Sequence, residues 1–378
     1  MYNQNKVNST NVKEVRLSEL DLPFKTTELS EYYKENIHLV GNELIVGYLS
    51  DDHHCETPFS EGSGLVYSAH RNSTTHEEMQ DSLALNHEWL PDLSLIEGYE
   101  ERLRSLWLQK AQNSLEFQIW AEQTPGARPT YSEAYYKRRA AKLWREDVCS
   151  IDDFDFTHEV KVELWSSLRS EGLIGDQCAV MLDCYEHGGQ CWSISGAGIQ
   201  DRWDTANGIG CWVPDEVAKE EIERRAACYS FGQIKDNGAW SKSGGRKLYY
   251  VEFDSDFATN ENRKFNSWSD AFEWMMQVVN KHKPLRRKLS TEKRLLIGRR
   301  RAATELAECT LETYNQWLQG SVFGVVIATF NNVGTQDNPK WAFDDSEEVW
   351  GYIGGDNAME EMTYLVKSKV ENLAQKVA

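Results

Sequence analysis

The sequence predicts an α+β fold: a helical N-terminal part followed by an antiparallel sheet with packed helices. Up to about residue 150 the apolar residues mostly recur at helical spacing, whereas short strand-like segments follow one another from residue 178 to residue 213. The 14 Trp, 16 Tyr and 13 Phe residues supply enough apolar surface for a packed core. From the length of 378 residues we expect two domains: a mainly helical one at 1–160 with a short strand pair, and an α+β one at 161–378.

In the N-terminal part, residues 28–37 are typical of a short helix. β-branched residues predict strands at 42–50 and 65–70. Residues 93–123 keep apolar residues at helical spacing, which predicts one long amphipathic helix. TPGARPT ends that helix, and another is expected over 131–148, before the acidic link at 150–159.

In the C-terminal part, strands are expected at 178–185, 190–195 and 209–213, joined through GG and NG turns into a meander. A helix beginning near Pro214 carries acidic residues in its first turn, which suits the helix dipole. The other expected elements are a strand at 248–257, a helix at 266–283 with Ser269 as its cap, a helix ending at Gly320, strands at 321–330 and 347–355, and a closing helix from Asp356 or Asn357.

The formal charge of −19, from 41 basic and 60 acidic residues, disfavours non-specific binding to DNA or to an anionic membrane and favours a basic partner. No segment reaches the roughly 20 apolar residues of a membrane span. The first 15 residues lack the apolar stretch of a secretory signal. We therefore expect a cytoplasmic protein with no membrane contact.

The eight cysteines form no CxxC pair, so the spacing of structural zinc sites is absent. Buried, reduced thiols are the expected state, with no metal and no cofactor. The P-loop, GxSxG, HExxH and GxGxxG motifs are also missing from the sequence. An enzyme would need an unfamiliar site, so a non-enzymatic role is favoured.

The segment RWDTANGIGCWVPDE (202–216) concentrates aromatic surface around an Asn207-Gly208 turn. In one interpretation Trp203 and Trp212 staple a hairpin, with Asp204 capping its own turn as an Asx-turn. In the other, an exposed indole anchors a partner, because Trp is enriched at binding hot spots. The first interpretation is preferred, and both tryptophans stay candidate binding residues.

Glu186 and His187, with Asp204, are weak catalytic candidates as an acid–base pair or an oxygen–nitrogen metal set. The alternative interpretation is that Glu186 and His187 are ordinary turn residues. Glu-His-Gly-Gly lies at a predicted hairpin turn, where polar residues are common.

Residues 281–301 hold ten basic residues and one acidic residue. Three interpretations are open: pairing with the protein's own acids, binding of nucleic-acid phosphates, or binding of an acidic partner. The basic candidates are Arg286, Arg287, Lys288, Arg299, Arg300 and Arg301. A second candidate binding surface has negative charge: it is the acidic run at 344–348, next to Trp350. Its candidate binding residues are Asp344, Asp345, Glu347, Glu348 and Trp350.

Four ordered segments, LDCYEHGG, RWDTANGIGCWV, YNQWLQGSVFGVVI and EEVWGYIGG, lie between residues 182 and 355. They resemble a family of mostly uncharacterised proteins of bacteriophages and other mobile elements, with Tyr-Glu-His-Gly/Ser, Trp-Asp-Ser/Thr and Trp-Gly-Tyr/Phe motifs. The resemblance covers about residues 178–378 and implies a phage or plasmid gene acting in a bacterial cytoplasm. We expect an acidic accessory protein that modulates or inhibits a host nucleic-acid-handling or defence complex, as a DNA mimic of the anti-restriction type. The alternative is a nucleic-acid-binding or processing factor that uses residues 281–301.

Overall fold

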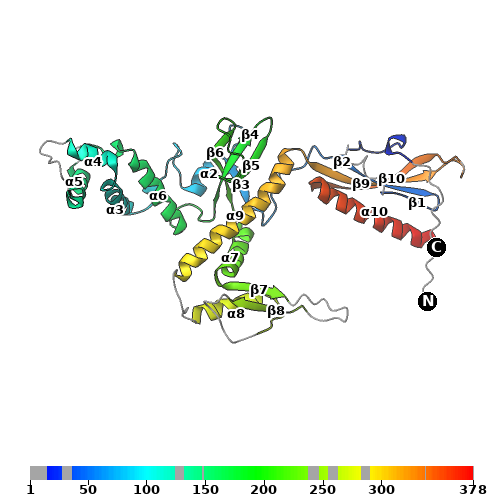
Figure 1. Ribbon diagram of the computed structural model, residues 1–378. Coiled ribbons are helices and arrows are strands. Elements are labelled where there is room, and N and C mark those ends of the chain that lie inside the picture. Colours follow the sequence, from blue (N-terminus) through cyan, green and yellow to red (C-terminus); the bar gives the residue numbers. More distant parts are fainter. Residues whose placement is uncertain are drawn as a thin grey trace. The chain divides into compact units, whose positions relative to one another are not determined.

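The structure is a computed structural model that describes residues 15–27, 36–123, 132–146, 149–236, 247–253, 263–281, 290–336 and 338–377. It is an α+β protein with antiparallel sheets, as the sequence predicts (Figure 1). The chain forms two compact units. The sheet unit comprises residues 1–59, 185–192 and 309–378, and the mixed unit comprises residues 60–184 and 193–308.

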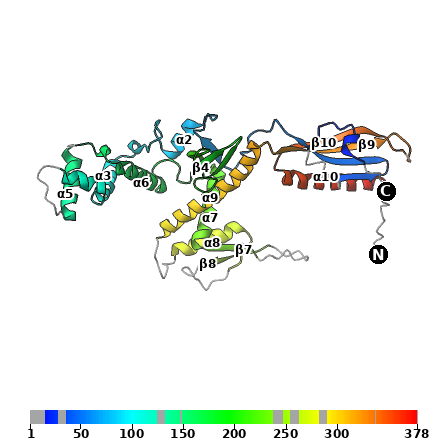
Figure 2. The ribbon, with the colours of Figure 1, turned by 45° about the horizontal axis from the view of Figure 1, so that its top comes forward.

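The sheet unit contains a four-stranded antiparallel sheet in the order β1-β2-β9-β10. Its strands are β1 (Ile37–Val40), β2 (Glu43–Asp51), β9 (Val322–Asn332) and β10 (Trp341–Ile353). The C-terminal helix α10 (Gly355–Val377) runs along one face of this sheet (Figures 1 and 2). The opposite face packs on the segment around the short helix η1 (Leu17–Glu19). The two central strands are therefore covered on both sides, which explains their nearly continuous apolar sequence.

Close packing of α10 depends on a glycine in β2. A Cβ added at Gly47 would lie 2.4 Å from Cγ2 of Val366 on α10. The absent side chain lets the helix approach the strand, so the core between them fills with Ile45, Val325 and Met362.

The mixed unit holds a second antiparallel sheet in the order β3-β6-β4-β5, and the hairpin tip of β4 and β5 belongs to the sheet unit. The strands are β3 (Leu65–Ser68), β4 (Val180–Glu186), β5 (Gln190–Ile194) and β6 (Thr205–Val213). Helix α2 (His76–Leu83) packs on this sheet through Met79 and Leu83. The three predicted strands are confirmed, but the meander is wrong, because β6 pairs with β4 rather than with β5 and β3 adds a fourth strand beside β6.

A helical cluster in the mixed unit surrounds the buried Trp107. It consists of η3 (Leu93–Leu95), α3 (Tyr99–Ala111), α4 (Leu115–Glu122), α5 (Glu133–Glu146), η4 (Ile151–Asp153) and α6 (Phe156–Ser170). The single helix expected over 93–123 is wrong, because Ser114 caps a new helix by accepting the Phe117 N–H. The acidic link at 150–159 is also wrong in part, since it contains η4 and the first turn of α6.

The rest of the mixed unit packs a β-hairpin against helices. It comprises α7 (Glu216–Phe231), β7 (Gly232–Asp236), β8 (Tyr249–Phe253), α8 (Trp268–Lys281) and the first part of α9 (Thr291–Leu318). Their core includes Phe231, Trp274 and Met275. Ser267 accepts the Asp270 N–H at the start of α8, so the cap lies two residues before the expected Ser269.

The two units do not follow the expected boundary near residue 160. Strand β2 pairs with β9 across about 280 residues of chain, from Glu43–Asn331 to Asp51–Phe323. The first 160 residues thus contribute strands to both sheets as well as helices. The helix expected at 28–37 lies outside the described residues except at its end, where Ile37 begins β1. Within the described part of the chain, no helix has both the length and the apolar character of a membrane span.

Candidate functional site

The loop before β6 is held by Asp201 rather than by Asp204. The Asp201 Oδ1 atom accepts the N–H of Trp203 at 2.8 Å and that of Asp204 at 3.1 Å. The hydroxyl of Thr205 accepts the Asp201 N–H and donates to the carbonyl of Ile199. The Asx-turn expected at Asp204 is therefore formed three residues earlier.

The two tryptophans of this segment have opposite surroundings. Trp203 is 84% exposed, and the Arg202 guanidinium lies 5.3 Å from its ring centre. Trp212 is fully buried and donates its indole N–H to the Ser63 carbonyl at 2.8 Å. Trp212 is thus a core residue, as the staple interpretation expects, but that interpretation is wrong for the exposed Trp203. Burial also makes Trp212 wrong as a binding residue, whereas the exposed-anchor interpretation of Trp203 stays a prediction.

Asn207 and Gly208 do not form the predicted hairpin turn, because both lie inside strand β6. Gly208 has a φ of +63°, which L-residues with side chains rarely adopt. Its N–H points to the Oδ1 atom of Asp183 at 2.8 Å. The glycine therefore turns a backbone donor towards a carboxylate of the neighbouring strand β4.

Asp183 is the polar centre of this sheet. Its carboxylate is 1% exposed and accepts four hydrogen bonds, from the N–H groups of Gly196 and Gly208, the Ser195 hydroxyl and the Gln200 amide, at 2.7–3.1 Å. Burial acts to raise the pKa of the Asp183 carboxyl, but these donors outweigh it and lower the pKa. The fully satisfied carboxylate joins β4, the β5–β6 loop and β6, so its role is structural.

Glu186 and His187 lie together at the tip of the β4–β5 hairpin, whereas Asp204 directly precedes β6. Glu186 ends β4, and the N–H of the exposed His187 donates to Gly189 in the tight turn to β5. These two residues belong to the sheet unit, whereas Asp204 belongs to the mixed unit. Among the described residues, no three His, Cys, Asp or Glu side chains are placed to hold a metal ion. The turn interpretation of Glu186 and His187 is the one that the backbone supports.

The acidic candidates lie on strand β10, at the edge of the sheet in the sheet unit. Asp344, Asp345, Glu347 and Glu348 are all exposed. Glu347 pairs with Lys369 of α10, so its charge is partly neutralised within the unit.

Trp350, the last of the β10 candidates, is 40% exposed. Its ring covers the Cα of Gly324, where an added Cβ would meet the indole at 2.2 Å, and lies edge-on to Phe24 at 5.1 Å. Part of the indole thus packs within the sheet unit and part is accessible to a partner.

The basic candidates of α9 differ among themselves. Arg299 makes a two-pronged ion pair with Glu223 of α7, at 2.6 and 3.1 Å. Arg301 pairs with Glu305 at 2.9 Å and lies over the Tyr229 ring. Pairing with the protein's own acids is therefore confirmed for these two. Arg300 instead donates to the hydroxyl of Ser170 on α6. Arg286, Arg287 and Lys288 lie outside the described residues.

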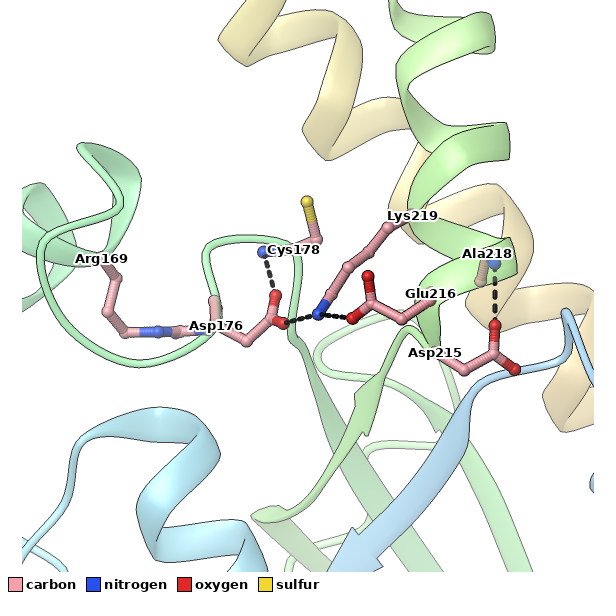
Figure 3. Close-up of polar contacts among 7 residues, drawn as sticks. All are labelled: Arg169, Asp176, Cys178, Asp215, Glu216, Ala218 and Lys219. Atoms are coloured by element: carbon pink, nitrogen blue, oxygen red, sulfur yellow. Dashed lines mark hydrogen bonds and ion pairs between the residues drawn. The ribbon is translucent and has the colours of Figure 1, made fainter.

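The loop between α6 and β4 carries polar residues that the sequence analysis missed. Asp176 accepts the Cys178 N–H at 2.8 Å and lies 3.5 Å from the Lys219 ammonium of α7, as Figure 3 shows. Lys219 also binds Glu216 at 3.0 Å, and this hydrogen bond is the main reason that the pKa of Lys219 is raised. The loop is thereby fastened to the first turn of α7.

Asp215 caps helix α7 and also holds a distant loop. Its Oδ1 atom accepts the Ala218 N–H at 2.8 Å (Figure 3). The second oxygen accepts the N–H groups of Gly62 and Gly64, at 2.8 and 3.2 Å. Burial acts to raise the pKa of the Asp215 carboxyl, but the backbone donors lower it overall. Nothing but its place before a helix could have marked this residue in the sequence.

Two buried thiols of the mixed unit, those of Cys178 and Cys211, are not poised for nucleophilic chemistry. Burial raises the pKa of Cys178 to about 11 and that of Cys211 to about 12. Both thiols are therefore protonated at neutral pH, whereas a cysteine nucleophile acts as the thiolate. The eight cysteines are all free of disulfides.

No family model, curated protein or solved structure matches the chain.

Proposed function

We propose that this chain is an acidic binding protein whose working surface is the β10 surface, defined as Phe343, Asp344, Asp345, Glu348, Val349 and Trp350. The observation that carries the proposal is the joint exposure, on one edge strand, of three large apolar residues and of three acids that make no ion pair with the described residues. Acidic residues attract a basic partner over distance, and partly exposed aromatic residues serve as anchors after contact.

The geometry of β10 also suits partner binding. The strand ends the order β1-β2-β9-β10, and within the described residues no further strand pairs with its outer edge. Register shifts at Phe343–Asp345 and at Val349–Tyr352 mark irregular pairing with β9 at both ends of the acidic run. Such bulges re-aim side chains and discourage simple strand addition. We therefore favour recognition through side chains over β-augmentation.

The wider role that we propose is an accessory protein of a bacteriophage or other mobile element. It acts in the bacterial cytoplasm, where it binds and modulates a host nucleic-acid-handling or defence complex. The formal charge of −19 supports this role, because an acidic surface can occupy a groove that normally takes nucleic-acid phosphates. The ordered motifs of residues 182–355 support the mobile-element origin.

The competing explanation of the β10 surface is a protective role, in which the acids only keep the sheet edge from aggregating.

A pair of charge-reversal variants separates these explanations. Asp344→Lys/Asp345→Lys changes the β10 surface, and Glu360→Lys/Glu371→Lys changes the net charge equally at exposed acids of α10. We expect the first variant, and not the second, to lose the protein that the wild type captures from a bacterial lysate. Melting temperatures of both should stay near that of the wild type, since surface changes alter stability by less than about 0.5 kcal/mol each. Equal capture by both variants would contradict the proposal.

Plain DNA is the second probe in this experiment. If residues 281–301 bind nucleic acid instead, DNA should bind at low salt and weaken steeply as salt rises. In that case Asp344→Lys/Asp345→Lys should strengthen the binding.

A further inference from the structure

A small pocket of the mixed unit gathers positive and hydrogen-bonding groups. Its volume is about 250 Å³, and it is lined by residues of α6, of the loop into β4, and of α9. The polar lining residues are Ser166, Arg169, Ser170, Gln177, Arg300 and Thr304. Pockets for drug-sized ligands usually measure roughly 300–1,000 Å³. This pocket therefore suits one small polar group, either free or at the end of a larger molecule.

Arg169 is fixed in this pocket but is not neutralised. Its Nη2 atom donates to the carbonyls of Asp176 and Ala179, at 3.0 and 3.1 Å, and its guanidinium lies 5.0 Å from the Trp165 ring centre. The Nε atom is buried and makes no hydrogen bond to the described residues. Burial removes water from the Arg169 cation and thereby lowers its pKa. Carbonyl oxygens and a ring orient the guanidinium, but they carry no full negative charge.

Arg300 brings a second cation to the same pocket. It donates to the Ser170 hydroxyl and, unlike its neighbours on α9, has no ion pair with a carboxylate of the described residues. Its charge further lowers the pKa of Arg169, because the two guanidinium groups repel each other. The carboxylate whose field reaches Arg169 is that of Asp176. It already binds the Lys219 ammonium and the Cys178 N–H.

We propose that this pocket binds a phosphate monoester group. The Arg300 guanidinium offers planar pairs of donors that match phosphate oxygens, and Arg169 adds a second positive charge. The Ser166 hydroxyl and the Gln177 amide can add further hydrogen bonds. The nearby Cys178 thiol stays neutral, since burial raises its pKa to about 11, so it does not repel an anion. The proposal concerns the mixed unit and does not depend on the β10 surface.

Inorganic phosphate is the first probe. The wild-type protein, labelled with 15N-arginine, is titrated with phosphate at constant ionic strength, and the arginine Nε–Hε signals are followed by NMR. We expect saturable shifts of the Arg169 and Arg300 signals. Arg300→Gln should weaken binding by about tenfold or more, the typical loss for one hydrogen-bonded charge. Arg301→Gln is the matched control, because Arg301 is paired with Glu305 on the same helix, and it should change the affinity by less than about twofold.

Arg300 is exposed, so Arg300→Gln should fold normally, which an unchanged melting temperature verifies. The absence of a saturable shift in the wild type would overturn the proposal. Equal weakening in Arg300→Gln and Arg301→Gln would also overturn it, because it would indicate general charge attraction rather than a pocket.

Two further titrations identify the source of the phosphate. A nucleoside 5′-monophosphate represents small phosphorylated molecules, and a short DNA strand is compared with a 5′-phosphate and with a 5′-hydroxyl. Preference for the mononucleotide or for the 5′-phosphorylated strand supports the proposal and names the source. Equal binding of the two strands, with the same loss in Arg300→Gln, would overturn it, since the pocket would then recognise internal phosphodiesters.

Discussion

Asp183 shows how one carboxylate organises the segment around Trp203. Because it accepts four hydrogen bonds in a buried position, Asp183→Asn replaces an acceptor by an amide that faces N–H donors. We expect a loss of about 3 kcal/mol in the free energy of unfolding, measured by urea denaturation. Asp204→Asn, in the same segment but half-exposed, is the control and should cost less than about 1 kcal/mol. Similar losses in both variants would contradict this role.

The pKa of Asp183 adds a test by pH. A carboxyl whose pKa is lower in the folded state stabilises the fold above its unfolded pKa of about 3.9. That stabilisation is lost as the pH falls through the folded value. We therefore expect the unfolding free energy of the wild type to fall more steeply below about pH 4 than that of Asp183→Asn. Parallel curves would show that Asp183 is not the group that titrates.

The tryptophans supply a third test at the residue scale. Trp212→Ala empties a fully buried position and should destabilise the protein by about 3–5 kcal/mol. Trp203→Ala removes a side chain that is 84% exposed and should cost less than about 0.5 kcal/mol. Thermal unfolding of the two variants is the measurement. A large loss for Trp203→Ala would contradict the exposed position that the structure gives to this indole.

Sequence reasoning could locate this segment but not assign its residues. Two tryptophans and an Asn-Gly pair correctly marked a rigid β-structure. Which indole is buried was not predictable, because the sequence pattern places Asn207 and Gly208 in a turn, whereas both lie inside β6. Asp183 was missed because its four donors, two backbone N–H groups and two side chains, come from the β5–β6 loop and from β6, which lie 12 to 25 residues further along the chain.

At the scale of elements, Asp215 joins the start of α7 to the loop at residues 62–64. Asp215→Ala should cost about 2 kcal/mol, because it removes both the helix cap and the loop contacts. Asp215→Ser keeps an oxygen for the cap but lacks the second oxygen, so it should recover about half of the loss. Urea unfolding measures the stability, and hydrogen exchange at Gly62 and Gly64 measures the loop. Protection of these amides in Asp215→Ser that equals the wild type would contradict the two-oxygen account.

Most elements were predictable because their apolar pattern is strong, with helical periodicity in α8 and a continuous apolar run in β9. The errors lie where a local polar group competes with periodicity. Ser114 interrupts a pattern that otherwise continues from α3 into α4, and the acids of residues 150–159 conceal the start of α6. In both places a short capping or turn contact decides the boundary, which a period of 3.6 residues does not encode.

At the scale of the whole molecule, the sequence could not reveal that each unit is built from separate parts of the chain. The pairing of β2 with β9 joins segments about 280 residues apart, and no local pattern indicates such a pair. The charge pattern of the sequence told more about the arginines at 299–301 than the local patterns told about strand pairing. Of the three arginines at 299–301, two are neutralised by acids of the same unit, and the third lines a pocket with a residue that the sequence did not single out.

On the proposed function, the acids of the β10 surface bring a basic partner to the protein. The most direct measurement is the association rate constant of the captured partner at several ionic strengths. We predict fast association that slows steeply with salt, and a reduction of about tenfold at low salt for Asp344→Lys/Asp345→Lys with little change in dissociation. Glu360→Lys/Glu371→Lys should slow association by less than about twofold. Association that is insensitive to salt, or equally slow in both variants, would contradict the claim.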